Sequence, residues 1–182
     1  MPKAFNRSGF FLFECMIVIA FIIIITALSV GFSNYNTRAQ VRAELEKLHA
    51  LILYAQHKAI IENGVIMLAI NTSEHSYELI DQNGNKQKHK LGQGALFGFI
   101  EGAKGPPWRP KKDLNDPVTF KDHVLFFYPD GTMNAGAIYI TNQEKSVLYA
   151  LSSSASALVY IRLYRFIRKN TGSKWDLLTA RA

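Results

Sequence analysis

The chain has 182 residues, a formal net charge of +7 and one cysteine, Cys15. A single cysteine excludes an intramolecular disulfide and a cysteine metal cluster, and the length suits one modest domain rather than two. The basic balance is compatible with anionic lipid or nucleic acid as a partner but requires neither.

Residues 10–32 form an apolar run in which Glu14 is the only ionisable side chain besides Cys15. About 20 such residues cross a bilayer as a helix, so we predict a membrane-spanning segment here. A carboxylate in hydrocarbon costs about 2.5 to 3.5 kcal/mol, which indicates that Glu14 is functional and has a partner. A plain signal-anchor is the alternative. A signal peptide that is removed whole has a shorter apolar core, and Cys15 lacks the small preceding residues of a lipoprotein site.

Residues 33–63 are predicted to continue the helix as an amphipathic half. Apolar residues recur there at steps of three and four, with charged residues on the other faces. Gly64 is expected to end the helix in a left-handed conformation, and Gly31 makes a bend or local melting between the halves plausible. The apolar stripe comprises Val41, Leu45, Leu48, Ile52, Ala55 and Ala59.

Residues 64–182 are predicted to form a β-rich domain, because short β-branched and aromatic segments alternate there with turn signals. Asn83-Gly84 and the Pro-Asp-Gly-Thr sequence at 129–132 each predict a hairpin turn, the second joining strands 123–128 and 137–141. The Gly- and Pro-rich region 92–119 is expected to be an irregular connection. The other predicted strands are 65–70, 76–80, 86–91, 95–100, 146–151 and 158–167, with a loop at 152–154.

The N-terminal motif resembles the class III signal of type IV pilin-like proteins. Gly9-Phe10 followed by Glu14 carries this resemblance. It implies that residues 1–9 are a leader, that a prepilin peptidase cuts between Gly9 and Phe10, and that the new N-terminus of Phe10 is methylated. It also implies that Glu14 faces the Phe10 amine of a neighbouring subunit during assembly. Two charges buried together cost far less than either alone.

The whole chain is similar to the GspH/FimT family of minor pilins and pseudopilins, through its long N-terminal helix, the glycine-rich connection and the Phe126-Phe127-Tyr128 segment before the 129–132 turn. The resemblance implies an α+β fold, a long N-terminal helix packed on a small antiparallel domain of two sheets. It implies a subunit that initiates or caps a pseudopilus in type II secretion or a type IV pilus. Its partners would be other pilins, the prepilin peptidase and membrane lipid. The helix would anchor it once in the inner membrane, with the C-terminal domain in the periplasm or outside.

We predict no enzyme activity, no cofactor and no metal site. The sequence lacks the common zinc-protease, serine-hydrolase and phosphate-loop motifs, and its five histidines are scattered.

The basic C-terminal region supports an alternative, a DNA-binding minor pilin in natural transformation. Tyr160, Arg162 and Tyr164 would share one strand face, with Leu163 on the core side, and arginine beside aromatic rings can hold a DNA strand. An unrelated membrane-anchored β-domain is a third alternative. The candidate nucleic-acid contacts are Arg162, Arg165, Arg168 and Lys169.

Overall fold

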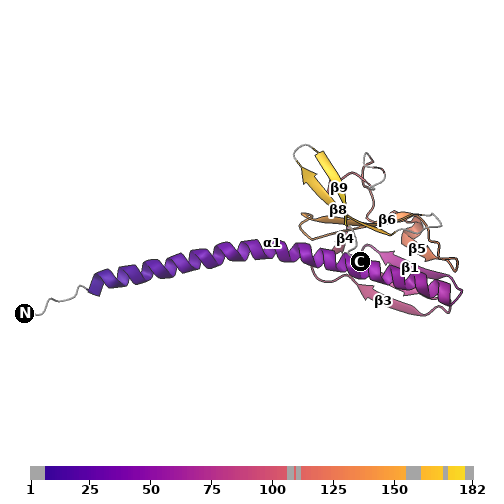
Figure 1. Ribbon diagram of the computed structural model, residues 1–182, viewed down its shortest axis with the longest axis horizontal. Coiled ribbons are helices and arrows are strands. Elements are labelled where there is room, and N and C mark those ends of the chain that lie inside the picture. Colours follow the sequence, from indigo (N-terminus) through magenta and orange to yellow (C-terminus); the bar gives the residue numbers. More distant parts are fainter. Residues whose placement is uncertain (1–6, 106–108, 110–111, 155–160, 170–171, 179–182) are drawn as a thin grey trace, which may run out of the picture. The chain divides into compact units, whose positions relative to one another are not determined.

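The computed structural model describes residues 7–105, 109, 112–154, 161–169 and 172–178, which form one long helix and two antiparallel sheets (Figure 1). The first sheet has the order β3-β2-β1-β5 and the second the order β4-β6-β7-β8-β9. The predicted α+β class is therefore confirmed. The elements are α1 (Arg7–Ile61), β1 (Ile66–Asn71), β2 (Ser76–Ile80), β3 (Lys86–Lys90), β4 (Leu96–Phe97), the 3-10 helix η1 (Lys121–His123), β5 (Val124–Phe127), β6 (Gly136–Thr141), β7 (Leu148–Ser153), β8 (Arg162–Lys169) and β9 (Gly172–Leu178).

Helix α1 is continuous through Gly31, so the local melting considered for that region does not occur. The chain divides into two compact units, Met1–Thr37 and Arg38–Ala182, and the boundary falls inside α1. By length and hydropathy, no helix within the described residues qualifies as a membrane span.

The end of α1 differs in one respect from the prediction. Asn63, rather than Gly64, takes the left-handed conformation, with φ 47°. The Gly64 N–H donates to the Ala59 carbonyl at 3.1 Å and the Asn63 N–H to the Ile60 carbonyl at 3.3 Å, which is the Schellman arrangement. At Gly64, an added Cβ would meet the far end of the exposed Gln82 side chain, which would have to move.

The predicted apolar stripe of α1 is confirmed, since all six of its residues have no exposed surface. They share one core with the inner face of the first sheet, including Leu68 and Leu125, and with Ile138 and Leu151 of the second sheet. The period of 3.6 residues thus placed one continuous face of the helix against both sheets.

The first predicted hairpin is confirmed as β2 and β3, which pair from Ser76↔Lys90 to Ile80↔Lys86. Asp81 organises its turn: one carboxylate oxygen accepts the N–H groups of Asn83 and Asn85 at 2.9 Å, and the other accepts the Asn85 side-chain amide. These bonds to the charged form lower the pKa of the Asp81 carboxyl. Lys58 of α1 lies 3.6 Å from the same carboxylate, so the hairpin is tied to the helix.

The prediction of a second hairpin, across the turn at 129–132, is wrong. The turn at 129–132 forms, with the Tyr128 N–H donating to the Thr132 carbonyl at 2.9 Å, but β5 pairs with β1 in the first sheet while β6 joins the second. Asn134 explains the separation. Its side chain accepts the Phe126 N–H at 2.8 Å and donates to the Val124 carbonyl at 3.0 Å, so it occupies the edge of β5 that a returning strand would use.

The C-terminal strands extend the second sheet further than predicted. Strand β7 includes Ser152 and Ser153, which were expected in a loop, and β9 was not predicted at all. Residues 158–160 of the predicted strand lie outside the described residues. The described part of the connection at 92–119 is irregular as expected, and β4 has only two residues.

Candidate functional site

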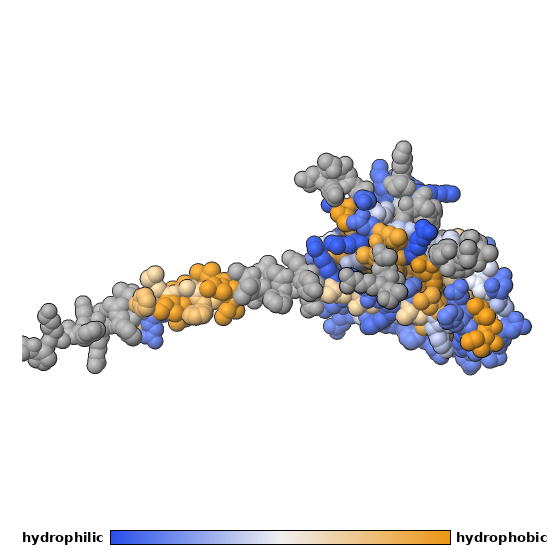
Figure 2. Space-filling model, in the orientation of Figure 1, coloured by the Kyte–Doolittle hydropathy of each residue, from blue (hydrophilic) through white to orange (hydrophobic). Residues whose placement is uncertain are grey.

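Gly9, Phe10 and Glu14 lie in the first turns of α1, which begins at Arg7. Phe10 and Glu14 are four residues apart, so they occupy one face of the helix about one turn apart. Glu14 is exposed, and exposed apolar residues lie near it in the sequence, among them Phe11, Phe13 and Met16. The described part of this segment is largely hydrophobic in Figure 2. A carboxylate is thus presented within an apolar surface.

Thr26, another polar residue of this segment, differs from Glu14 in its hydrogen bonding. The Thr26 hydroxyl lies 2.9 Å from both the Ile22 and the Ile23 carbonyl oxygens, so it is satisfied within the helix. No partner of the Glu14 carboxylate lies among the described residues. In an apolar surrounding, that carboxylate would need a partner from outside the helix, since an unpaired buried charge is costly.

The C-terminal arginines lie on β8 but do not share one face. Side chains alternate along a strand, so Arg162 and Arg168 project on the side of Tyr164 and Phe166, whereas Arg165 projects on the opposite side with Leu163. Arg165 also lies directly across from Asp176 of β9. Leu163 is buried as predicted. Tyr160 and the side chain of Lys169 lie outside the described residues.

Trp175 is the residue of this region that sequence reasoning missed. Its ring lies 5.1 Å from Phe166 and 5.9 Å from Tyr139, and its indole N–H donates to the Lys104 carbonyl at 2.7 Å. Trp175 therefore joins β9 to the connection before β5, on the same face of the sheet as Arg162 and Arg168. The alternation of Trp175 with Leu177 was a signal for a strand that could have been used.

A cavity of about 210 Å³ is lined by residues of the connection between β4 and the 3-10 helix. His123 Nε2 lies 3.0 Å from a carboxylate oxygen of Asp116, which lines this cavity. The Thr119 hydroxyl, also in the lining, accepts the Ala137 N–H at 2.8 Å. Among the described residues, Asp116 is the hydrogen-bond partner of His123, and no hydroxyl or thiol bonds to its ring. Within the same residues, no group of three metal-binding side chains comes together.

Comparison with known proteins gives similarity in structure only. No protein-family model matches the sequence, and no curated protein matches it. Two structures of the minor pseudopilin EpsH from the type 2 secretion system of Vibrio cholerae are similar to this chain, each at 11% identity. One similarity covers 76% of this chain and 96% of the other with a TM-score of 0.45, and the second covers 68% and 94% with a TM-score of 0.46. Likeness at this level supports no inference about activity or partners.

Proposed function

We propose that the protein is a minor pilin or pseudopilin, a structural subunit that initiates or caps a fibre in type II secretion or a type IV pilus system. One observation carries the proposal. The Gly9-Phe10 pair and Glu14 stand in the first turns of a helix that runs unbroken to Ile61, and the far half of that helix supplies the core stripe of a two-sheet domain. A catalytic role has no comparable support.

In this proposal, residues 10–32 lie in the inner membrane and the domain lies in the periplasm or outside. Cleavage after Gly9 converts Phe10 into a free amine one helical turn before Glu14. The carboxylate of one subunit then pairs with the amine of the next, because pairing offsets the cost of placing either charge in hydrocarbon. The apolar surface around Glu14 supports this interpretation.

The processing step provides the test. We expect Gly9→Val to leave the chain at precursor length, because the peptidase must accommodate a residue without a side chain at the cut. Intact mass spectrometry of the protein expressed with a prepilin peptidase would measure this, and the wild type should lose nine residues and gain one methyl group on Phe10.

Gly31→Val is the matched control, since Gly31 lies in the same helix but away from the proposed cut. This variant should be shortened normally. A Gly9→Val chain that still lost residues 1–9 would rule out the proposed cleavage site.

Arg162 and Arg168 support a second candidate, a DNA-binding minor pilin. These arginines are exposed and share a face of the β8–β9 hairpin with the partly buried rings of Tyr164 and Trp175, whereas Phe166 on the same face is buried. Guanidinium groups contact phosphates and aromatic rings stack on bases, so this face has the composition of a single-strand binding surface.

The alternation of the arginines gives a sharp test of this candidate. If the face binds DNA, Arg162→Ala with Arg168→Ala should weaken binding of a single-stranded oligonucleotide by about tenfold or more, while Arg165→Ala should have little effect, because it projects from the other side. Fluorescence anisotropy with full-length protein in detergent at increasing salt would measure it. If Arg165→Ala weakened binding as much as the double substitution does, the binding would be nonspecific charge attraction and this face would be rejected as a site.

A further inference from the structure

Strand β3 is a fully exposed edge of the first sheet. All five of its residues, Lys86–Lys90, are exposed, and β2 is its neighbour in the sheet. The opposite edge of this sheet differs, because the Asn134 side chain already bonds to the backbone of β5. Of the two edges, β3 is therefore the one whose outer backbone groups have no hydrogen-bond partner among the described residues.

The hydrogen bonds at the two ends of the β2–β3 hairpin show which residues of β3 face outward. The Asp81 N–H donates to the Asn85 carbonyl at 3.1 Å, and the Leu91 N–H donates to the His75 carbonyl at 3.0 Å. Bonded and non-bonded pairs alternate in an antiparallel ladder, so Gln87 and His89 bond to β2. The backbone N–H and C=O groups of Lys86, Lys88 and Lys90 consequently point away from the sheet.

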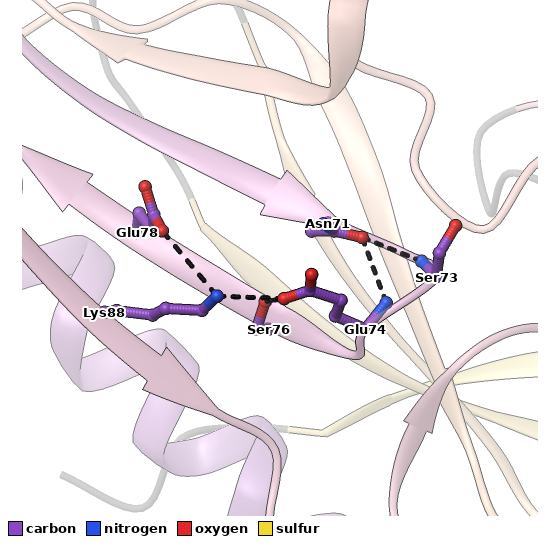
Figure 3. Close-up of polar contacts among 6 residues, drawn as sticks. All are labelled: Asn71, Ser73, Glu74, Ser76, Glu78 and Lys88. Atoms are coloured by element: carbon purple, nitrogen blue, oxygen red, sulfur yellow. Dashed lines mark hydrogen bonds and ion pairs between the residues drawn. The ribbon is translucent and has the colours of Figure 1, made fainter.

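The side chains of the same three lysines lie on one face of the sheet. Lys88 Nζ lies 2.9 Å from a Glu74 carboxylate oxygen and 4.0 Å from one of Glu78 (Figure 3). The hydrogen bond to Glu74 raises the pKa of Lys88 and lowers that of Glu74. Lys86 and Lys90 lie across from Ile80 and Ser76, which carry no charge. On this face, Lys88 therefore already pairs with carboxylates. Lys86 and Lys90, on either side of Lys88, have no acidic residue directly across from them in β2.

We propose that β3 accepts an extended segment of a partner protein that carries carboxylates at alternate positions, by addition of a strand to the sheet. The outward backbone groups and the lysine side chains belong to the same residues. An added strand would therefore bond to Lys86, Lys88 and Lys90 and place its own side chains directly beside theirs. Opposite charges in such pairs are favourable and like charges are not, so an acidic strand fits whereas β3 of a second copy would set lysine against lysine.

The β2–β3 hairpin is also held in place before any partner binds. Asp81 holds its turn through three hydrogen bonds and lies close to Lys58 of α1, and His89 stacks on Tyr77 with ring centroids 5.4 Å apart. A partner strand would therefore add to an edge that is already ordered. Lysines on an edge also prevent unwanted pairing, and that role alone predicts no binding of an acidic strand. The proposal does not depend on processing, on the membrane segment or on fibre assembly.

The test uses full-length protein in detergent and a fluorescent peptide, with glutamate at every second position, that is long enough to span the five residues of β3. We expect binding that weakens by about tenfold in Lys86→Glu with Lys90→Glu, and by less in Lys86→Gln with Lys90→Gln. Lys121→Glu with Lys145→Glu is the matched control, because both lysines are exposed and lie outside β3, and it should bind as the wild type does. Circular dichroism melting would establish that each variant is folded.

Two further measurements separate strand addition from charge attraction. The same peptide with alternate backbone nitrogens methylated keeps its carboxylates but loses its donors, so it should not bind. By NMR, the amide hydrogens of Lys86, Lys88 and Lys90 should exchange fast in the free protein and slowly with peptide, while those of Gln87 and His89 should be slow in both. Equal binding of the methylated peptide, an unchanged affinity of the Lys→Glu variant, or binding of an oligonucleotide or anionic vesicles at β3 in place of the peptide would each overturn the proposal.

Discussion

Glu14→Ala is expected to leave the chain inserted in the membrane and cleaved after Gly9, but to abolish its incorporation with other pilins. Removing the carboxylate eases insertion, yet it leaves the Phe10 amine of the adjacent subunit without its partner in hydrocarbon. Loss of one member of a buried pair costs about 3 to 5 kcal/mol, which corresponds to a decrease in assembly affinity of about a hundredfold or more. Co-purification with partner pilins from detergent-solubilised membranes would measure this loss.

The control for this experiment is Glu46→Ala. Glu46 pairs with Arg42 at 2.8 Å on an exposed part of the same helix, where such pairs contribute little. Its incorporation should be normal. Glu14→Gln keeps the size of the side chain and should fail as Glu14→Ala does, because the charge is what the amine requires. Wild-type assembly of either Glu14 variant would eliminate the pairing hypothesis.

Leu48→Ala should lower the free energy of unfolding of the domain by about 3 to 5 kcal/mol, because Leu48 has no exposed surface and the substitution leaves a cavity between α1 and the sheets. For a domain of this size, that loss lowers the melting temperature by about 6 to 20 °C. Thermal unfolding followed by circular dichroism at the β-sheet signal would record the shift.

Leu53→Ala is a matched control for Leu48→Ala, since it is the same change on the same helix at a side chain that is 37% exposed. This substitution should lower the free energy of unfolding by under about 1 kcal/mol. Equal shifts for the two variants would show that the stripe from Val41 to Ala59 is not the face that stabilises the domain.

The sequence alone was sufficient wherever a local pattern determines the structure. The 3.6-residue period of α1 predicted which six residues are buried, and the Asn83-Gly84 turn predicted the β2–β3 hairpin. The numbering alone also shows that Arg165 projects from the opposite face of a strand to Arg162 and Arg168, because residues an odd number of positions apart lie on opposite faces. The proposed roles of Gly9, Phe10 and Glu14 rest on sequence as well, and the structure adds their place in the first turns of α1.

Tertiary structure decided what depends on contacts between distant residues. The turn at 129–132 is followed by a change of sheet rather than a hairpin, because the Asn134 side chain occupies the edge of β5 and leaves β6 to pair with β4 and β7. Strand β9 has a mixed polar composition and gains its stability from β8 and from the contact of Trp175 with the Lys104 carbonyl. A local pattern determines the conformational preference of a segment. Which strand forms hydrogen bonds with its backbone depends on segments far away in the chain. For that reason the individual elements were largely predictable here, while the allocation of β5 and β6 to different sheets was not.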